Sequence, residues 1–268
     1  MCLDIAFYSA LELIDNYFPS LQHDGEMDFD PAIGEHVFAI GHKRYPVIIE
    51  EGSHFKRKFF EWGIIAEYMD TPEKIKAQRK SMVNARSEKI VEDKRSFWHR
   101  IRHTRCLIPV TGIYEHRAIH GWKNKVPYHI HLKGRSMFCL PGLYHYNRNI
   151  PSDPETGEVR GMFTLITRPG NETMRQIHND GPNAYRMPLF LPKELEMRWL
   201  DPSLTDEEMH RIMNFEIPSA ELIYEAVYSI RSRQQRPDGR KKHEAFAYPY
   251  LPPLGNDEGE QQASLFAL

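Results

Sequence analysis

Four side chains, spread widely along the chain, carry groups that could act together in catalysis: Cys2, Asn84, Glu115 and His178. Removal of Met1 would leave Cys2 with a free α-amine and a thiol on one residue. The amine, with an unperturbed pKa of about 7.7–8.0, is largely available near neutral pH, and the thiol, at about 8.5, is partly so. An aldehyde that meets such a residue forms a Schiff base with the amine, after which the sulfur closes a five-membered thiazolidine ring. The Met1-Cys2 pair therefore predicts covalent nucleophilic chemistry.

Each of these residues also has an ordinary structural interpretation. A cysteine at position 2 is compatible with chance, and Asn84 could cap a helix. Glu115 could be a surface strand residue, and His178 could be a loop histidine. For each residue taken singly, the ordinary interpretation is favoured.

Short strands and peripheral helices must position these side chains. Runs of β-branched and aromatic residues predict strands, at residues 2–8, 36–40, 45–50, 105–110, 113–115, 127–132, 137–144, 161–167 and 226–228. Apolar spacing and capping residues predict helices, at residues 10–17, 72–80, 96–98, 171–177, 195–200 and 206–215. The pattern indicates an α+β protein with a mostly antiparallel, barrel-like β core in a single domain, residues 1–248.

Residues 249–268 are rich in Pro, Gly, Asp, Glu and Gln, which predicts a disordered tail. Within it, Gln262-Ala263-Ser264-Leu265-Phe266 resembles the pentapeptide by which bacterial proteins bind the replication sliding clamp. Leu265 and Phe266 would be apolar anchor residues at the end of a polar linker, with Gln262 as a further contact residue. The alternative is a frayed terminus that contains Leu-Phe by chance.

The charge is unevenly distributed, although the formal net charge is only -2. No Lys or Arg precedes Lys43, whereas residues 74–105 carry eleven Lys or Arg against three acids, Glu88, Glu92 and Asp93. Such a local excess attracts polyanions, and neutralisation of phosphates is the usual source of nucleic-acid affinity. The alternative is a solvated helical face.

Composition argues against several classes of protein. The three cysteines are widely spaced and form neither a disulfide framework nor a CxxC zinc pattern, so no metal and no cofactor are expected. No apolar run approaches the length of a transmembrane helix, and no signal peptide is evident. We therefore expect a soluble monomer in the cytoplasm of a bacterial-type cell, associated with the nucleoid and not with a membrane.

An ordered set of motifs resembles the SOS-response-associated peptidase family from Cys2 to about Val227. The motifs are Met1-Cys2, Trp62-Gly63, Asn84-Ala85-Arg86-Ser87-Glu88, residues 106–115, Pro141-Gly142-Leu143-Tyr144, residues 163–167, and His178 before Arg186-Met187-Pro188. Members of that family capture abasic sites in single-stranded DNA as a covalent crosslink to the terminal cysteine. The resemblance implies the same substrate and chemistry here, in the response to DNA damage.

The resemblance also implies a role for each matched residue. Cys2 would attack the sugar aldehyde, and Asn84 would orient the Cys2 amine. Glu115 would be the general acid and base, and His178 would assist opening of the sugar ring. The expected DNA contacts are a stacking surface at the lesion and basic side chains along the backbone, namely Trp62, Arg86, Arg105 and Arg186.

The sequence departs from the family pattern near the expected site. Leu3-Asp4 stands where Gly-Arg is usual, and His116 stands where a tryptophan is usual. Residues 179–185 separate His178 from Arg186, which are usually closer together. Two other functions remain open: a thiol hydrolase or peptidase that uses Cys2 on amides, and a non-covalent single-stranded DNA-binding module.

Overall fold

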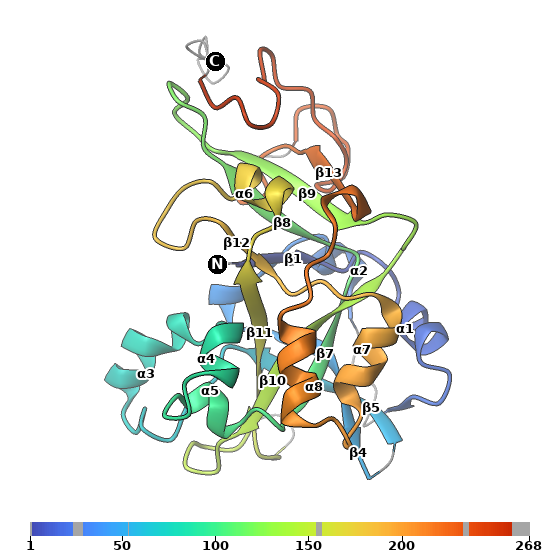
Figure 1. The fold of residues 1–268 in the computed structure, drawn as a ribbon, viewed down its shortest axis with the longest axis vertical. Helices are drawn as coiled ribbons and strands as arrows, with labels where there is room; N and C mark the ends of the chain where they lie inside the picture. The colour runs from blue at the N-terminus through green and yellow to red at the C-terminus, as the bar shows by residue number, and fades with distance from the viewer. Residues whose placement is uncertain (1, 24–28, 53, 154–156, 233–235, 259–268) are drawn as a thin grey trace.

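Two β-sheets form the centre of the protein, with short helices around them (Figure 1). The computed structural model describes residues 2–23, 29–52, 54–153, 157–232 and 236–258. The predicted α+β class is confirmed, and most strand pairs are antiparallel.

The larger sheet has the strand order β12-β11-β10-β7-β4-β5-β2, and β6 pairs with β11 off this path. Its strands are β2 (Gln22–His23), β4 (Arg44–Glu51), β5 (His54–Trp62), β6 (Asn84–Arg86), β7 (Arg105–Val110), β10 (Phe138–Tyr146), β11 (Gly161–Pro169) and β12 (Arg186–Pro188). A parallel pairing of β11 with β5 closes a ring through β10, β7 and β4. Apolar side chains of these strands, including Val47, Leu107 and Phe163, belong to the main core.

The smaller sheet has the order β13-β9-β8-β1-β3 and carries the start of the chain. Its strands are β1 (Asp4–Ala6), β3 (Val37–Phe38), β8 (Gly112–Arg117), β9 (Val126–Leu132) and β13 (Leu222–Ala226). Strand β1 pairs antiparallel with β8, and Asp4 lies opposite Tyr114. This register brings residue 2 to the end of β8 that holds Glu115.

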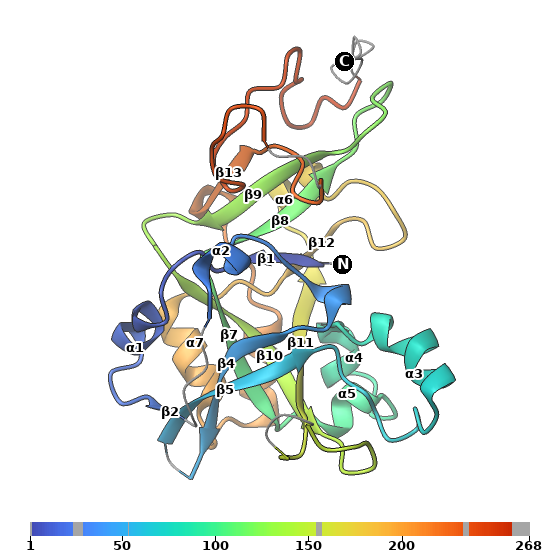
Figure 2. The ribbon, with the colours of Figure 1, turned by 180° about the vertical axis from the view of Figure 1, so that it is seen from behind.

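Local capping signals explain where several helices begin. The helices are α1 (Glu12–Tyr17), α2 (Pro31–Gly34), α3 (Pro72–Gln78), α4 (Ser87–Val91), α5 (Phe97–Arg100), α6 (Glu172–Ile177), α7 (Lys193–Leu200) and α8 (Asp206–Met213), with short 3-10 turns at 39–41, 79–81 and 219–221. The Asn171 side chain accepts a hydrogen bond from the Met174 amide at 3.0 Å and starts α6. Thr205 and Glu208 form a capping box at α8. Helices α3, α4 and α5 lie together on one side of the larger sheet (Figures 1 and 2).

Part of the tail that the sequence predicts from residue 249 is described in the structure. Residues 249–258 are described, and the buried Arg117 of β8 binds them. Its guanidinium donates to the backbone oxygens of Pro252, Pro253 and Asn256 and pairs with the Asp257 carboxylate at 2.7 Å. The proposed clamp-binding residues Gln262, Leu265 and Phe266 lie outside the described residues.

No helix in the described ranges is both long enough and apolar enough to cross a bilayer.

Candidate active site

Cys2 lies just before β1, inside the protein. Its side chain is 1% exposed, and its Sγ lies 3.7 Å from the Asp4 backbone oxygen. Burial raises the pKa of the Cys2 thiol well above its usual range, and the negative charge of Glu115 raises it further. The thiol is therefore protonated near neutral pH, so a nucleophilic role requires a proton acceptor beside it.

Asn84 is held next to Cys2 by strand β6. Parallel pairing with β11 sets Asn84 opposite Leu165, and its Nδ2 donates a hydrogen bond of 2.8 Å to the backbone oxygen of Cys2. Its buried Oδ1 has no hydrogen-bond partner among the described residues. The structure thus brings Asn84 to the cysteine, while the expected contact with the Cys2 amine stays a prediction.

Glu115 lies on strand β8 of the smaller sheet, and its carboxyl group is buried. It is 4% exposed, and its Oε1 has no hydrogen-bond partner in the described part of the chain. Burial raises the pKa of Glu115 to about 8. A group with a pKa near the working pH both donates and accepts protons readily, as general acid–base catalysis requires.

His178 directly follows helix α6 and is buried. Its Nδ1 lies 2.8 Å from the backbone oxygen of Arg186, which can only accept, so the ring proton is on Nδ1. Burial lowers the pKa of His178 to about 4, so the ring is neutral near pH 7 and Nε2 is the proton acceptor. Residues 179–185 do not break this contact, because the Tyr185 amide donates back to the His178 oxygen at 2.7 Å.

The four residues lie on or next to different secondary-structure elements. Cys2 lies just before β1, Asn84 is on β6 and Glu115 is on β8. His178 is positioned by α6 and β12, and both β6 and β12 pair with β11. Strand β11 therefore links two of the four site residues to the larger sheet, beside the N-terminal end of the chain (Figure 1).

The expected DNA contacts divide into two pairs. Arg86 is exposed on β6, and its guanidinium bonds only Asn183 Oδ1, at 2.8 Å, among the described residues. Arg186 is partly buried, and Glu88 holds it through two hydrogen bonds of 2.8 and 2.9 Å. Both lie close to β11, and their contacts with a DNA backbone stay predictions.

The structure buries the other two expected contacts, Trp62 and Arg105. The Trp62 ring is fully buried, stacks on Phe163 and donates from Nε1 to the Val83 oxygen at 2.8 Å. Arg105 donates to the backbone oxygens of Trp199 and Asp201. Contacts of Trp62 with a base and of Arg105 with phosphate do not fit this structure, because both side chains are occupied inside the protein.

The basic segment 74–105 is only partly available to a polyanion. Lys74, Arg79, Lys89 and Arg102 already form ion pairs with neighbouring carboxylates. The remaining exposed cations of the segment, apart from Arg86, are Lys76, Lys80, Lys94, Arg95 and Arg100. They lie on or beside α3, α4 and α5, and these helices lie together on one side of the larger sheet (Figure 2).

An ion pair that the sequence did not reveal lies next to the site. The buried Asp4 carboxylate accepts hydrogen bonds from His36 at 2.6 Å and from Arg231 Nε at 3.0 Å. Burial alone would raise the pKa of Asp4, but these two partners bring it below its ordinary value. Asp4 is therefore a paired charge and not a repulsive one. Arg231 is 227 residues away from Asp4 in the sequence, so no local sequence pattern predicts this contact.

No cluster of three or more His, Cys, Asp or Glu side chains suited to a metal ion occurs within the described ranges.

Comparison with known proteins identifies the family of the chain. The sequence profile of the SOS response associated peptidase (SRAP) family matches residues 1–230. The chain belongs to this family. The abasic site processing protein YoaM of Bacillus subtilis is 30% identical over 214 residues, which cover 78% of this chain and 82% of YoaM. The abasic site processing protein YoqW of the same organism is 35% identical over 161 residues, which cover 60% of this chain and 64% of YoqW.

A solved structure from the same comparisons supports the fold. A crystal structure of a protein from Bacteroides thetaiotaomicron matches with a TM-score of 0.70 and 29% identity, over 84% of this chain and 92% of that one. The family match ends at residue 230, so the segment 231–258 that contains Arg231 and reaches Arg117 lies beyond it.

Proposed function

We propose that this protein captures abasic sites in single-stranded DNA through Cys2, as a thiazolidine crosslink, in the response to DNA damage. The observation that carries the proposal is that the buried Cys2 accepts a hydrogen bond from Asn84 and lies within electrostatic reach of the buried carboxyl group of Glu115. Two relatives named abasic site processing proteins support the same substrate.

The chemistry begins with hydrolysis of the Met1–Cys2 bond, which frees the Cys2 amine. An abasic sugar exists mainly as a closed ring, and only its open form has an aldehyde. His178 Nε2 accepts the proton of the C1′ hydroxyl as the ring opens and returns it to the departing ring oxygen, which becomes the C4′ hydroxyl. The neutral ring of His178 suits this step, because its pKa of about 4 leaves Nε2 unprotonated near pH 7.

The bond-forming steps use the amine and the carboxyl group. The Cys2 amine adds to C1′, and the Glu115 carboxyl group gives its proton to the hydroxyl that leaves as water. This step leaves an iminium ion and the Glu115 carboxylate. The carboxylate then takes the thiol proton, and Sγ adds to C1′ to close the ring. The net change is one water released, with Glu115 returned to its protonated form.

Two features of the site support this use of Glu115. At pH 7 a carboxyl with a pKa of about 8 is about nine-tenths protonated, so the proton for the departing water is present. The same carboxyl group interacts electrostatically with the Cys2 thiol, which needs an acceptor because its own pKa is raised. The amide of Asn84 fixes the Cys2 backbone while these protons move.

The test is a denaturing gel of the mature protein incubated with an oligonucleotide that carries one abasic site. We expect a covalent band that is lost in Cys2→Ala and slowed by about 10²–10⁴-fold in Glu115→Gln. A band that persists in Cys2→Ala would reject the mechanism. Turnover of a small amide without DNA would favour the thiol hydrolase, and salt-sensitive binding without any covalent product would favour the non-covalent module.

A further inference from the structure

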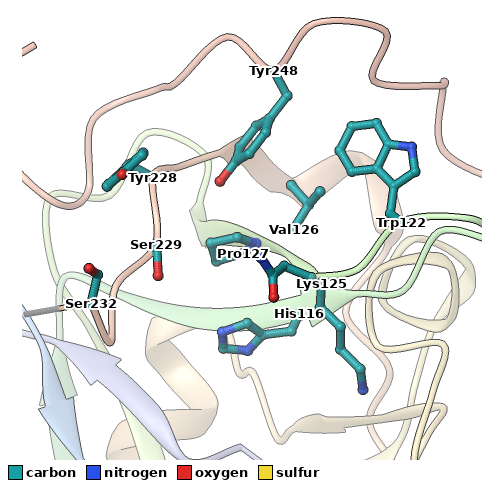
Figure 3. Close-up of a pocket in the computed structure, with 10 residues that line it drawn as sticks. His116, Trp122, Lys125, Val126, Pro127, Tyr228, Ser229, Ser232 and Tyr248 are labelled. Carbon is teal, nitrogen blue, oxygen red and sulfur yellow. The ribbon is translucent and has the colours of Figure 1, made fainter. Parts of the chain in front are cut away.

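A cavity of about 300 Å³ opens beside the catalytic cluster, at the end of strands β8 and β9 (Figure 3). Aromatic rings of His116, Trp122, Tyr228 and Tyr248 line it, together with Lys125 and Ser229. In Figure 3 the Trp122 and Tyr248 rings lie above His116, and the Lys125 side chain extends downward from beside His116, away from both rings. The volume is at the low end of the range for ligand sites, about 300–1,000 Å³, which suits a single planar ring.

The walls of the cavity are already fixed by contacts inside the protein. The Tyr248 hydroxyl donates to the Val227 oxygen at 3.0 Å, and its ring centroid lies 6.2 Å from that of Trp122. The Phe246 amide donates to the Ala226 oxygen at 2.8 Å, which ties the segment to β13. Further along, Arg117 holds residues 252–257. A ligand would therefore meet a formed site, with little ordering cost.

The cavity lies near the reacting groups. His116, in its floor, interacts electrostatically with His178, whereas Glu115, the residue before it on β8, points to the opposite face of the strand. The positive charge of Lys125 lowers the pKa of Glu115 and of His178, so its ammonium is within electrostatic reach of both. The Lys125 Nζ pairs at 2.7 Å with Asp180, and both side chains are exposed, so a phosphate could compete for it.

We propose that this cavity takes one nucleobase, that of the nucleotide next to the abasic site in the bound strand. The proposal rests on the function proposed above, because it concerns how the same DNA is held. The abasic nucleotide has no base of its own to bind, so the strand needs an anchor on a neighbour. Aromatic faces beside a cation suit any base, since each base offers a π-face and each nucleotide a phosphate.

The cavity also depends on residues beyond the family match. Tyr248 lies outside the match, which ends at residue 230, whereas His116, Trp122 and Lys125 lie within it. The position after Glu115, where a larger aromatic residue is usual, is His116, and its smaller ring forms part of the floor. The anchor for the neighbouring base is therefore built in part by this chain's own C-terminal segment.

The test uses single-stranded oligonucleotides with a tetrahydrofuran abasic analogue, which has no aldehyde and cannot crosslink. Binding is measured by fluorescence anisotropy with natural bases on both sides, and again with the 5′ or the 3′ neighbouring base removed. We expect removal of one of the two bases to weaken binding to the wild type about 5- to 150-fold. Trp122→Ala and Tyr248→Ala should bind all three oligonucleotides with nearly equal affinity.

Three further variants separate stacking from folding. Tyr248→Phe keeps the ring and loses only the bond to Val227, so it should retain the dependence on the neighbouring base. Trp122→Phe keeps a smaller aromatic ring and should retain part of the dependence of binding on the neighbouring base. Tyr250→Ala removes an aromatic ring that is 75% exposed and does not line the cavity, so it should behave like the wild type. Thermal melts of all variants check that they are folded.

Equal losses in wild type and Trp122→Ala on removal of either base would overturn the proposal. The same result is expected if the cavity instead takes an aromatic side chain of a protein partner. Failure of the covalent mechanism is a separate outcome. In that case the aldehyde oligonucleotide gives no crosslink, while the dependence on the neighbouring base persists in the anisotropy measurement.

Discussion

Replacement of Glu115 by glutamine tests whether a buried, protonated carboxyl group sits at the site. Burial moves the pKa of Glu115 from its ordinary value of 4.5 to about 8 in the folded protein. The unfolded chain releases this proton near pH 4.5, whereas the folded chain keeps it until about pH 8. Folding thus takes up a proton in this window, and stability falls as the pH rises through it. At about 1.4 kcal/mol per unit, the loss is about 3 kcal/mol by pH 7 and about 5 kcal/mol above pH 8.

Glutamine has the shape of the protonated acid and does not titrate. The difference in unfolding free energy between Glu115→Gln and the wild type should therefore shift in favour of the variant by about 5 kcal/mol between pH 4.5 and pH 8.5. Urea unfolding at several pH values measures this difference, and any constant cost of the amide cancels. Glu225→Gln, at an exposed position on β13, is the matched control and should show no such shift. A difference between Glu115→Gln and wild type that does not change with pH would refute the assignment of a raised pKa.

Three other tests, each with its own substitutions, concern neighbouring parts of the account. Asp4→Asn removes the charge that pairs with His36 and Arg231 and should lower the free energy of unfolding at pH 7 by about 2 kcal/mol in urea titrations; an unchanged midpoint would contradict the pair. Arg86→Ala should weaken binding to single-stranded DNA and reduce the salt slope by about 0.7, whereas Arg105→Ala should destabilise the fold and leave the slope unchanged. Leu265→Ala with Phe266→Ala should abolish capture by purified sliding clamp in a pull-down, and undiminished capture would remove the clamp hypothesis.

Strands with strong local patterns could be predicted from the sequence. The Arg105–Val110 strand has the predicted bounds, since its apolar run is bounded by the Thr111-Gly112 step. Strand β6 was not predicted, because Asn84–Arg86 has no strand pattern of its own and is extended only by pairing with β11. The last strand is predicted at 226–228 but runs from Leu222 to Ala226. Its bounds are set by pairing with β9, which the local sequence does not reveal.

The site residues themselves could be chosen from sequence, whereas their partners could not. The order of the motifs singled out Cys2 and Glu115, and the structure brings them within electrostatic reach of each other. Trp62 has an aromatic side chain that could stack on a base, and only its packing against Phe163 shows that the ring faces the core. The contact of Arg231 with Asp4 depends on how the C-terminal segment folds back, which no local pattern encodes.

The central claim is that the Cys2 amine and thiol together bind the abasic sugar. Intact-mass spectrometry of the mature protein after incubation with an abasic oligonucleotide, followed by proteolysis, tests it most directly. The account predicts one adduct equal to protein plus DNA minus one water, located on the peptide that begins with Cys2 and absent in Cys2→Ala. An adduct on a lysine, or on a chain that still carries Met1, would contradict the account.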